Sequence, residues 1–75
     1  MAIHYSKHAL ARLAERRVSI EDVAYVLDAP DAVSEGYGGR LLAERSLRGR
    51  RLRVIYTAVE DEITVITVYW KGERK

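Results

Sequence analysis

The first part of the chain places apolar and polar residues at helical spacing. Leu10, Leu13 and Ala14 recur every three to four residues, and residues 7–17 contain neither Gly nor Pro. Ser6 stands just before this stretch and is a residue type that caps helix N-termini. The pattern therefore predicts a helix over residues 7–17 with the apolar stripe on the core. The residues predicted on its opposite face are His8, Arg12, Glu15 and Arg16.

A second helix is predicted over residues 20–28. Ser19 and Asp22 have the spacing of a capping box, in which each side chain bonds to the backbone N–H of the other residue. Apolar residues at positions 20, 23, 24 and 27 supply its buried stripe. Pro30 ends the helix, because proline disfavours the helical conformation of the residue before it.

Beyond residue 30 the pattern changes to the alternation that is typical of strands. Leu52 and Val54 alternate with Arg51 and Arg53, so one face of this strand is apolar and the other begins basic. The segment Ile63–Trp70 is apolar on both faces except for its threonines, as in an internal strand or one that faces a second copy of the chain. We predict three or four antiparallel strands with residues 63–70 internal. The expected fold class is thus α+β, with two N-terminal helices packed on this sheet in a single domain over residues 1–75.

The composition is that of a small globular domain. A chain of 75 residues is long enough to bury about 60% of the surface of its unfolded state. Hydrophobic residues make up 48% and charged residues 32%, which is too apolar for a disordered chain. The apolar segments are too interrupted to cross a membrane, and the N-terminus lacks the pattern of a signal peptide. Since cysteine is also absent, we expect a cytoplasmic protein with no membrane association, no disulfide and no thiolate metal site.

Charge is distributed unevenly along the chain, although the formal net charge is only +2. Residues 18–39 carry five acidic residues and no cation, whereas residues 40–53 carry six arginines and only Glu44 as an acid. A basic surface attracts phosphates, because guanidinium groups match the geometry of phosphate oxygens. We therefore expect this surface to bind a phosphate-bearing partner, and the arginines expected to contact its phosphates are Arg16, Arg48, Arg51 and Arg53. The alternative is that these arginines pair with Glu44 and with the acidic second helix.

His8 is the candidate for proton transfer. Cleaving RNA without a metal needs a base for the 2′-hydroxyl, an acid for the leaving oxygen and cations for the phosphate, and histidine can serve as base or acid near neutral pH. Arg12 lies one turn further along the same helix face and is expected to hold the phosphate. The alternative for His8 is a structural role as a cap or a half-exposed side chain.

Thr67 and Tyr69 complete the candidate catalytic set. They are two residues apart on the predicted last strand, so they point to one face. They are expected to meet His8 if the first helix crosses that face, and their alternative role is packing within the strand. No metal and no cofactor is expected, because His4 and His8 have no carboxylate that completes a ligand set.

The segment SKHALARLAERRVSIEDVAYVLDAPD, followed by an arginine-rich hairpin and a closing VITVYW, resembles domain-of-unknown-function family 4258. The likeness spans nearly the whole chain, and its most specific part is the run His8-Ala9-Leu10 with Arg12. The family usually has glycine where this chain has Arg17, and arginine is unfavourable in the left-handed conformation that ends many helices. Either the helix ends differently here or Arg17 belongs to a basic surface.

The resemblance implies a RelE-like or barnase-like toxin nuclease: a metal-independent ribonuclease of a type II toxin–antitoxin system. The expected partners are then RNA and a cognate antitoxin protein, and a homodimer is left open. The residues themselves leave a second class open, a non-catalytic module of the same fold that binds nucleic acid or protein. Convergence of His8 and Arg12 with a hydroxyl or an arginine of the last two strands would favour catalysis, whereas an isolated His8 would favour binding.

Overall fold

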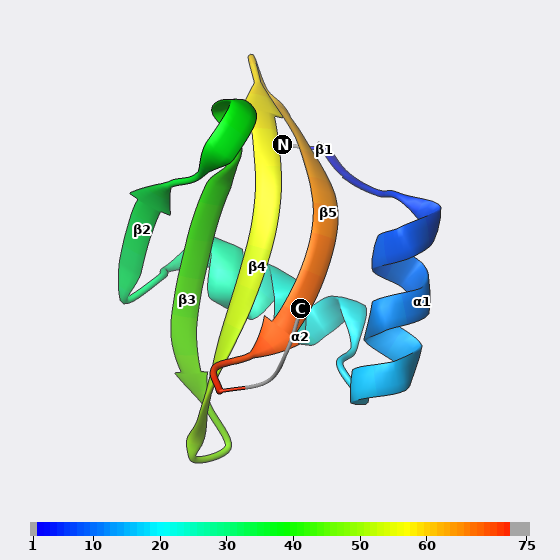
Figure 1. Cartoon of the computed structure of the whole chain (residues 1–75), viewed down its shortest axis with the longest axis vertical. Coiled ribbons are helices and arrows are strands. Elements are labelled where there is room, and N and C mark those ends of the chain that lie inside the picture. Colours follow the sequence, from blue (N-terminus) through cyan, green and yellow to red (C-terminus); the bar gives the residue numbers. More distant parts are fainter. Residues whose placement is uncertain (1, 73–75) are drawn as a thin grey trace.

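The computed structural model describes residues 2–72, which form two helices and a five-stranded sheet (Figure 1). The helices are α1 (Lys7–Arg16) and α2 (Ile20–Asp28), and a short 3₁₀ turn, η1, covers Tyr37–Gly39. The strands are β1 (Ala2–Tyr5), β2 (Ala32–Glu35), β3 (Leu41–Leu47), β4 (Arg50–Val59) and β5 (Glu62–Trp70). The α+β class and both predicted helices are therefore confirmed.

The sheet is larger than predicted, and it is mixed rather than antiparallel. Its order is β1-β5-β4-β3-β2, with β1 parallel to β5 and every other neighbouring pair antiparallel. The prediction missed β1 because its four residues are too few to show a period, and because its partner lies near the other end of the chain, with Ile3 opposite Ile63. β5 lies between β1 and β4, so the prediction of an internal last strand is confirmed.

Ser6 begins α1 and attaches it to the sheet. Its Oγ accepts a hydrogen bond from the Ala9 N–H at 3.0 Å, as expected of an N-cap. Its own N–H and Oγ donate to the carbonyls of Val65 and Ile66 in β5, each at 3.2 Å. The start of α1 is thereby held against β5 at the point where the pairing with β1 has ended.

The buried face of α1 differs from the predicted stripe. Ala9 and Leu13 are buried, whereas Leu10 is 50% exposed. Arg12 and Arg16, which the pattern places on the solvent face, are largely covered, with side-chain exposures of 27% and 14%. The helix tolerates this rotation because the aliphatic part of an arginine side chain can cover apolar surface.

Arg17 ends α1 in the left-handed conformation, with φ 55° and ψ 47°. The N–H of Val18 then bonds to the carbonyl of Leu13 at 2.9 Å, which is the closure that a glycine-terminated helix makes. The helix therefore ends in the usual way despite the missing glycine. Arg17 bears a steric cost of about 1 kcal/mol in this conformation.

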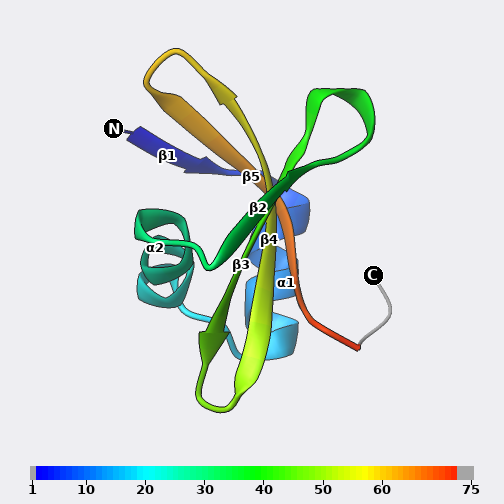
Figure 2. The same ribbon diagram turned by 90° about the vertical axis from the view of Figure 1, so that its left-hand side faces the viewer.

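The hydrophobic core lies between the helices and one face of the sheet. Leu52, Val54, Val65 and Val68 point to this side and are fully buried. In Figure 1, α2 lies behind the sheet and α1 lies beside β5, and Figure 2 shows α2 on one side of the sheet only. Neither helix covers the opposite face, which we call the open face. By strand alternation its residues on β3 to β5 include Leu42, Glu44, Arg51, Arg53, Ile55, Thr67 and Tyr69.

Candidate functional site

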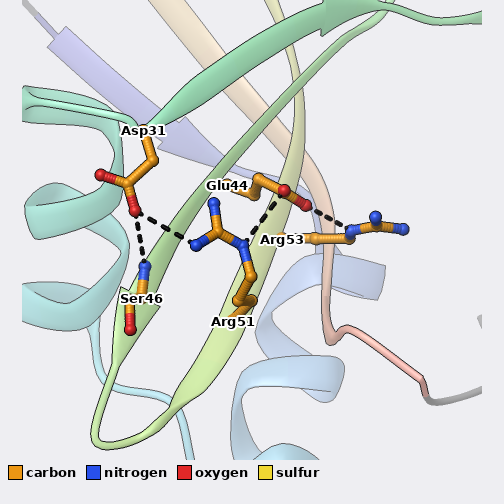
Figure 3. Close-up of polar contacts among 5 residues, drawn as sticks. All are labelled: Asp31, Glu44, Ser46, Arg51 and Arg53. Atoms are coloured by element: carbon orange, nitrogen blue, oxygen red, sulfur yellow. Dashed lines mark hydrogen bonds and ion pairs between the residues drawn. The ribbon is translucent and has the colours of Figure 1, made fainter.

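A polar network crosses the open face (Figure 3). Glu44 on β3 accepts two hydrogen bonds from β4, from Arg53 Nε to Oε2 at 2.7 Å and from Arg51 Nε to Oε1 at 3.2 Å. Arg51 Nη1 also donates to Asp31 Oδ2 at 3.4 Å, and the same oxygen accepts the Ser46 N–H at 3.1 Å. The strand register accounts for this arrangement, because Glu44 lies directly opposite Arg53.

The pairing changes the acid–base properties of the network. The hydrogen bond from Arg53 is the main cause of a lowered Glu44 pKa, and with the bond from Arg51 it outweighs partial burial, which would raise that pKa. The pKa of Arg53 is raised, first by Glu44 and then by a hydrogen bond with Tyr69. Glu44 is therefore a carboxylate and Arg53 a guanidinium throughout the neutral pH range.

The geometry leaves part of each charged group available to a ligand. Glu44 is engaged through the Nε atoms of its partners, and each carboxylate oxygen can accept a further hydrogen bond. Figure 3 shows the Nη atoms of Arg53 pointing away from Glu44. A hydroxyl group can therefore approach the carboxylate while a phosphate binds to the guanidinium beside it, which is the arrangement that metal-free RNA cleavage needs.

Two of the predicted catalytic residues, Thr67 and Tyr69, lie on this same face. Tyr69 is the register partner of Arg53, and its ring centroid lies 5.9 Å from the guanidinium carbon. Tyr69 is only 4% exposed, yet it is not part of the core cluster between sheet and helices. The structure thus places four of the eight predicted site residues on one face: Arg51, Arg53, Thr67 and Tyr69.

His8 and Arg12 are not joined to this group by any contact between described residues. They belong to α1, whose buried residues pack in the same core cluster as Val68, on the side of β5 opposite to Tyr69. His8 is exposed and makes no hydrogen bond or ion pair with residues 2–72. Arg12 Nη1 donates to Glu15 Oε2 at 2.6 Å. The first helix therefore does not cross the face of Thr67 and Tyr69, and the catalytic role of His8 stays a prediction.

A second group of cations surrounds Trp70 at one end of the molecule. Arg48 lies in the turn between β3 and β4, and Arg50 is the first residue of β4. Their guanidinium carbons lie 6.0 and 4.6 Å from the Trp70 ring centroid. Trp70 Nε1 donates to the carbonyl of Arg16 at 3.1 Å, which brings the end of α1 to the same place. Lys71 follows Trp70 and Arg17 follows Arg16, and both of these cations are exposed. We call the four exposed cations the basic end: Arg17, Arg48, Arg50 and Lys71.

Among residues 2–72, the basic end keeps more uncompensated charge than the open face. Arg48 pairs with Asp22 at 3.3 Å but remains 58% exposed. Partial burial would raise the pKa of Asp22, but hydrogen bonds from Ser19 and Arg48 outweigh it and lower that pKa. The other three cations of the basic end have no acidic partner among residues 2–72. The predicted RNA-binding arginines are therefore divided between two regions with different electrostatics.

Glu44 is the site residue that the sequence argument did not select as a reacting group. It entered only as a partner that neutralises arginines, and that pairing is confirmed. The sequence does hold a signal for its position, because Gly49 predicts a turn. The structure gives Arg48 and Gly49 positive φ angles of 51° and 78°, which are those of a tight two-residue hairpin turn. Because the two strands pair from Leu47 and Arg50 beside this turn, Glu44 lies opposite Arg53.

Fold and site together define an α+β domain with one sheet face that neither helix covers (Figure 2) and that carries ionised and hydroxyl side chains. The chain belongs to the family described as Domain of unknown function (DUF4258), whose model matches residues 5–70. No curated protein and no solved structure matches it. In the part of the chain that the structure describes, no helix is long and apolar enough to span a membrane. Within the same residues, no three His, Cys, Asp or Glu side chains are grouped so that they could bind a metal ion.

Proposed function

We propose that this chain is a metal-independent ribonuclease of the RelE-like toxin type and that the reaction takes place on the open face. The observation that carries the proposal is the position of Glu44 between the Nε atoms of Arg51 and Arg53. Tyr69, hydrogen-bonded to Arg53, adds a hydroxyl to the same group. Family membership and the two helices that precede the antiparallel strands support the assignment to this fold.

Each step of RNA cleavage has a group on the open face. The Glu44 carboxylate takes the proton of a ribose 2′-hydroxyl, and the 2′-oxygen attacks the adjacent phosphorus. Arg51 and Arg53 stabilise the negative charge that develops on the phosphate oxygens. The bond to the 5′-oxygen breaks, and Tyr69 donates the proton that this leaving oxygen requires. The products are a 2′,3′-cyclic phosphate and a 5′-hydroxyl end.

The basic end has a separate role in this proposal. Its exposed cations attract the RNA backbone, because three of them have no acidic partner among residues 2–72, and binding there releases condensed counterions. Lys71 connects the two regions, because its N–H donates to the carbonyl of Arg51 at 2.9 Å. A cognate antitoxin protein would inhibit the enzyme by covering the same cations.

A non-catalytic RNA-binding module is the second candidate function. Two observations favour it: the uncompensated cations of the basic end, and the isolation of His8 on α1. In this alternative, the Glu44 network only stabilises the sheet through cross-strand pairs. The two candidates therefore differ in whether Glu44 has a chemical role.

Cleavage assays with matched carboxylate-to-amide variants distinguish the two functions. Purified wild type, Glu44→Gln and Glu15→Gln are incubated with a panel of single-stranded RNAs, with and without ribosomes, in the presence of a chelator. Glu44→Gln keeps the size of the side chain and a hydrogen-bond acceptor but removes the base. We expect it to cut more slowly by about 10²–10⁴-fold, the usual contribution of a positioned base. Glu15→Gln alters a carboxylate outside the open face and should cut like wild type.

His8→Ala, assayed in parallel, tests the sequence-based hypothesis. If it loses cleavage while Glu44→Gln retains it, the reaction depends on α1 rather than on the open face. If wild type cuts none of the RNAs yet binds them, the binding module is the correct function.

A further inference from the structure

A hollow of about 160 Å³ adjoins the Glu44 network on the open face. Its floor is formed by side chains of three neighbouring strands, Leu42 on β3, Ile55 on β4 and Tyr69 on β5. Leu42 and Ile55 are register partners, so they lie side by side. The loop from β2 to β3 forms the rim, and in Figure 2 it leans toward the side of the sheet away from α2.

Tyr37 stands on this rim with 95% of its surface exposed. The Gly36 N–H donates to the carbonyl of Arg40 at 2.6 Å and closes the loop at its base. Gly38 has φ 68° and ψ 33°, a left-handed conformation that glycine adopts without steric cost. The fold thus holds a large aromatic ring at the edge of a hollow without burying it, although burial of such a ring is a main source of stability elsewhere in proteins.

Polar side chains complete the rim. Ser34 offers a hydroxyl, Glu35 a carboxylate and Arg40 a guanidinium, and all three residues are exposed. The hollow therefore presents an apolar floor, an aromatic ring, and both donors and acceptors at its edge. A nucleobase has the matching form, with flat apolar faces and a polar edge, and unpaired bases are commonly recognised by aromatic stacking with hydrogen bonds to the edge. An isolated phosphate would not match the apolar floor and the carboxylate.

We propose that this hollow binds one unpaired nucleobase of single-stranded RNA, stacked on Tyr37 and hydrogen-bonded at its edge by the polar rim. The inference rests on the proposed function and deepens it, because Tyr69 belongs both to the hollow and to the group around Arg53. A base held here sets a neighbouring phosphate beside the arginines. A base paired within a duplex cannot enter, so the substrate of the open face is single-stranded RNA.

The test is a titration of the ¹⁵N-labelled Glu44→Gln protein with the four ribonucleoside 5′-monophosphates, followed by amide chemical shifts. Ribose 5-phosphate, which has the same sugar and phosphate without the base, is the control ligand. We expect the nucleotides, and not ribose 5-phosphate, to shift the amides of Tyr37, Arg40, Leu42 and Ile55. Adding Tyr37→Ala should weaken nucleotide binding by at least about fivefold, the lower end of the effect of losing one base–aromatic stack.

Two further variants separate stacking from other effects. Tyr37→Phe keeps the ring and should bind within about twofold of its parent, since stacking does not need the hydroxyl. Tyr25→Ala removes an exposed tyrosine of α2 that does not line this hollow and should leave binding unchanged. The inference is overturned if no nucleotide shifts the amides around the hollow, or if Tyr37→Ala binds like its parent.

The result is independent of the cleavage assay. If wild type cleaves RNA but the hollow binds no nucleotide, the inference fails and the proposed function stands. If nucleotides bind in the hollow but wild type does not cleave, the ribonuclease proposal fails and the base site stands as part of a binding module.

Discussion

The open face and the basic end both contain arginines from the arginine-rich segment 40–53, but the two regions differ in the residues that surround those arginines. On the open face, Arg51 and Arg53 are engaged by Glu44 and Asp31. At the basic end, Arg50 stacks on Trp70 and has no acidic partner among residues 2–72. A run of arginines therefore does not by itself locate a phosphate-binding surface, because the strand register decides which of these arginines lie beside an acidic residue. One region is suited to oriented chemistry and the other to attraction of a polyanion.

The largest effect expected of an arginine substitution comes from a contrast between one arginine of each region. Arg53→Lys should lower the single-turnover rate of RNA cleavage by about 10- to 100-fold, because lysine lacks the planar fork that bonds both Glu44 and a phosphate. Arg50→Lys, at the basic end, keeps the charge that attracts RNA and should change this rate by less than about twofold. Equal losses in the two variants would show that the regions do not differ in role.

The second prediction contrasts affinity. Combined Arg17→Ala and Arg50→Ala should weaken RNA binding about tenfold and reduce the slope of log affinity against log salt by about 1.4, because two phosphate contacts with a single strand are lost. Combined Arg51→Ala and Arg53→Ala should change the slope by less than half as much, since the carboxylates of Glu44 and Asp31 together offset their two charges. Fluorescence anisotropy at several salt concentrations measures both slopes. A larger change for the second pair would reverse the comparison.

The third prediction concerns the strained residue of the basic end. Arg17→Gly should raise the free energy of unfolding by about 1 kcal/mol, because glycine adopts the left-handed conformation at φ 55° without steric cost. The same change should weaken RNA binding, so that stability and affinity move in opposite directions. Arg17→Ala, which removes the charge but keeps the strain, should weaken binding without the gain in stability. Denaturant unfolding and anisotropy measure the two effects.

The smallest effect is the pH dependence of the open face. Because the folded state lowers the pKa of Glu44, its contribution to stability is complete above the ordinary carboxyl pKa and is lost as the pH falls through the lowered folded value. Glu44→Gln should therefore reduce the loss of stability between pH 6 and pH 3, by about 0.5–1 kcal/mol. Asp22→Asn should act in the same direction at the basic end. Unfolding curves at pH 6 and pH 3 test this. If Glu44→Gln lost as much stability between these pH values as wild type does, the prediction would be contradicted.

Local structure was predictable wherever the interacting residues are close together in the sequence. The cap at Ser6 and the capping box of Ser19 with Asp22 formed as expected, and they placed both helices within one residue of the predicted bounds. The alternation of Leu52 and Val54 with arginines likewise identified the buried face of β4. These features depend on backbone hydrogen bonds and side-chain period, which a short stretch of sequence contains.

The arrangement of the candidate site was not predictable from the same local patterns. His8 and Tyr69 were expected to meet, but they belong to opposite sides of β5, because the attachment of Ser6 to Val65 and Ile66 sets where α1 lies. Glu44 was known as an acid among arginines, but the register of the β3–β4 hairpin made it the centre of the open face.

The sequence by itself determined two capped helices, an apolar face for the central strands, an internal last strand, and the family of the chain, since each of these depends on short-range pattern and residue type. Only the tertiary structure decided the parallel pairing of β1 with β5, the rotation of α1 that covers Arg12 and Arg16, and the division of the arginines between two regions. These depend on contacts between residues far apart in the chain, whose geometry is set when the elements pack together and not by the residues of any one element.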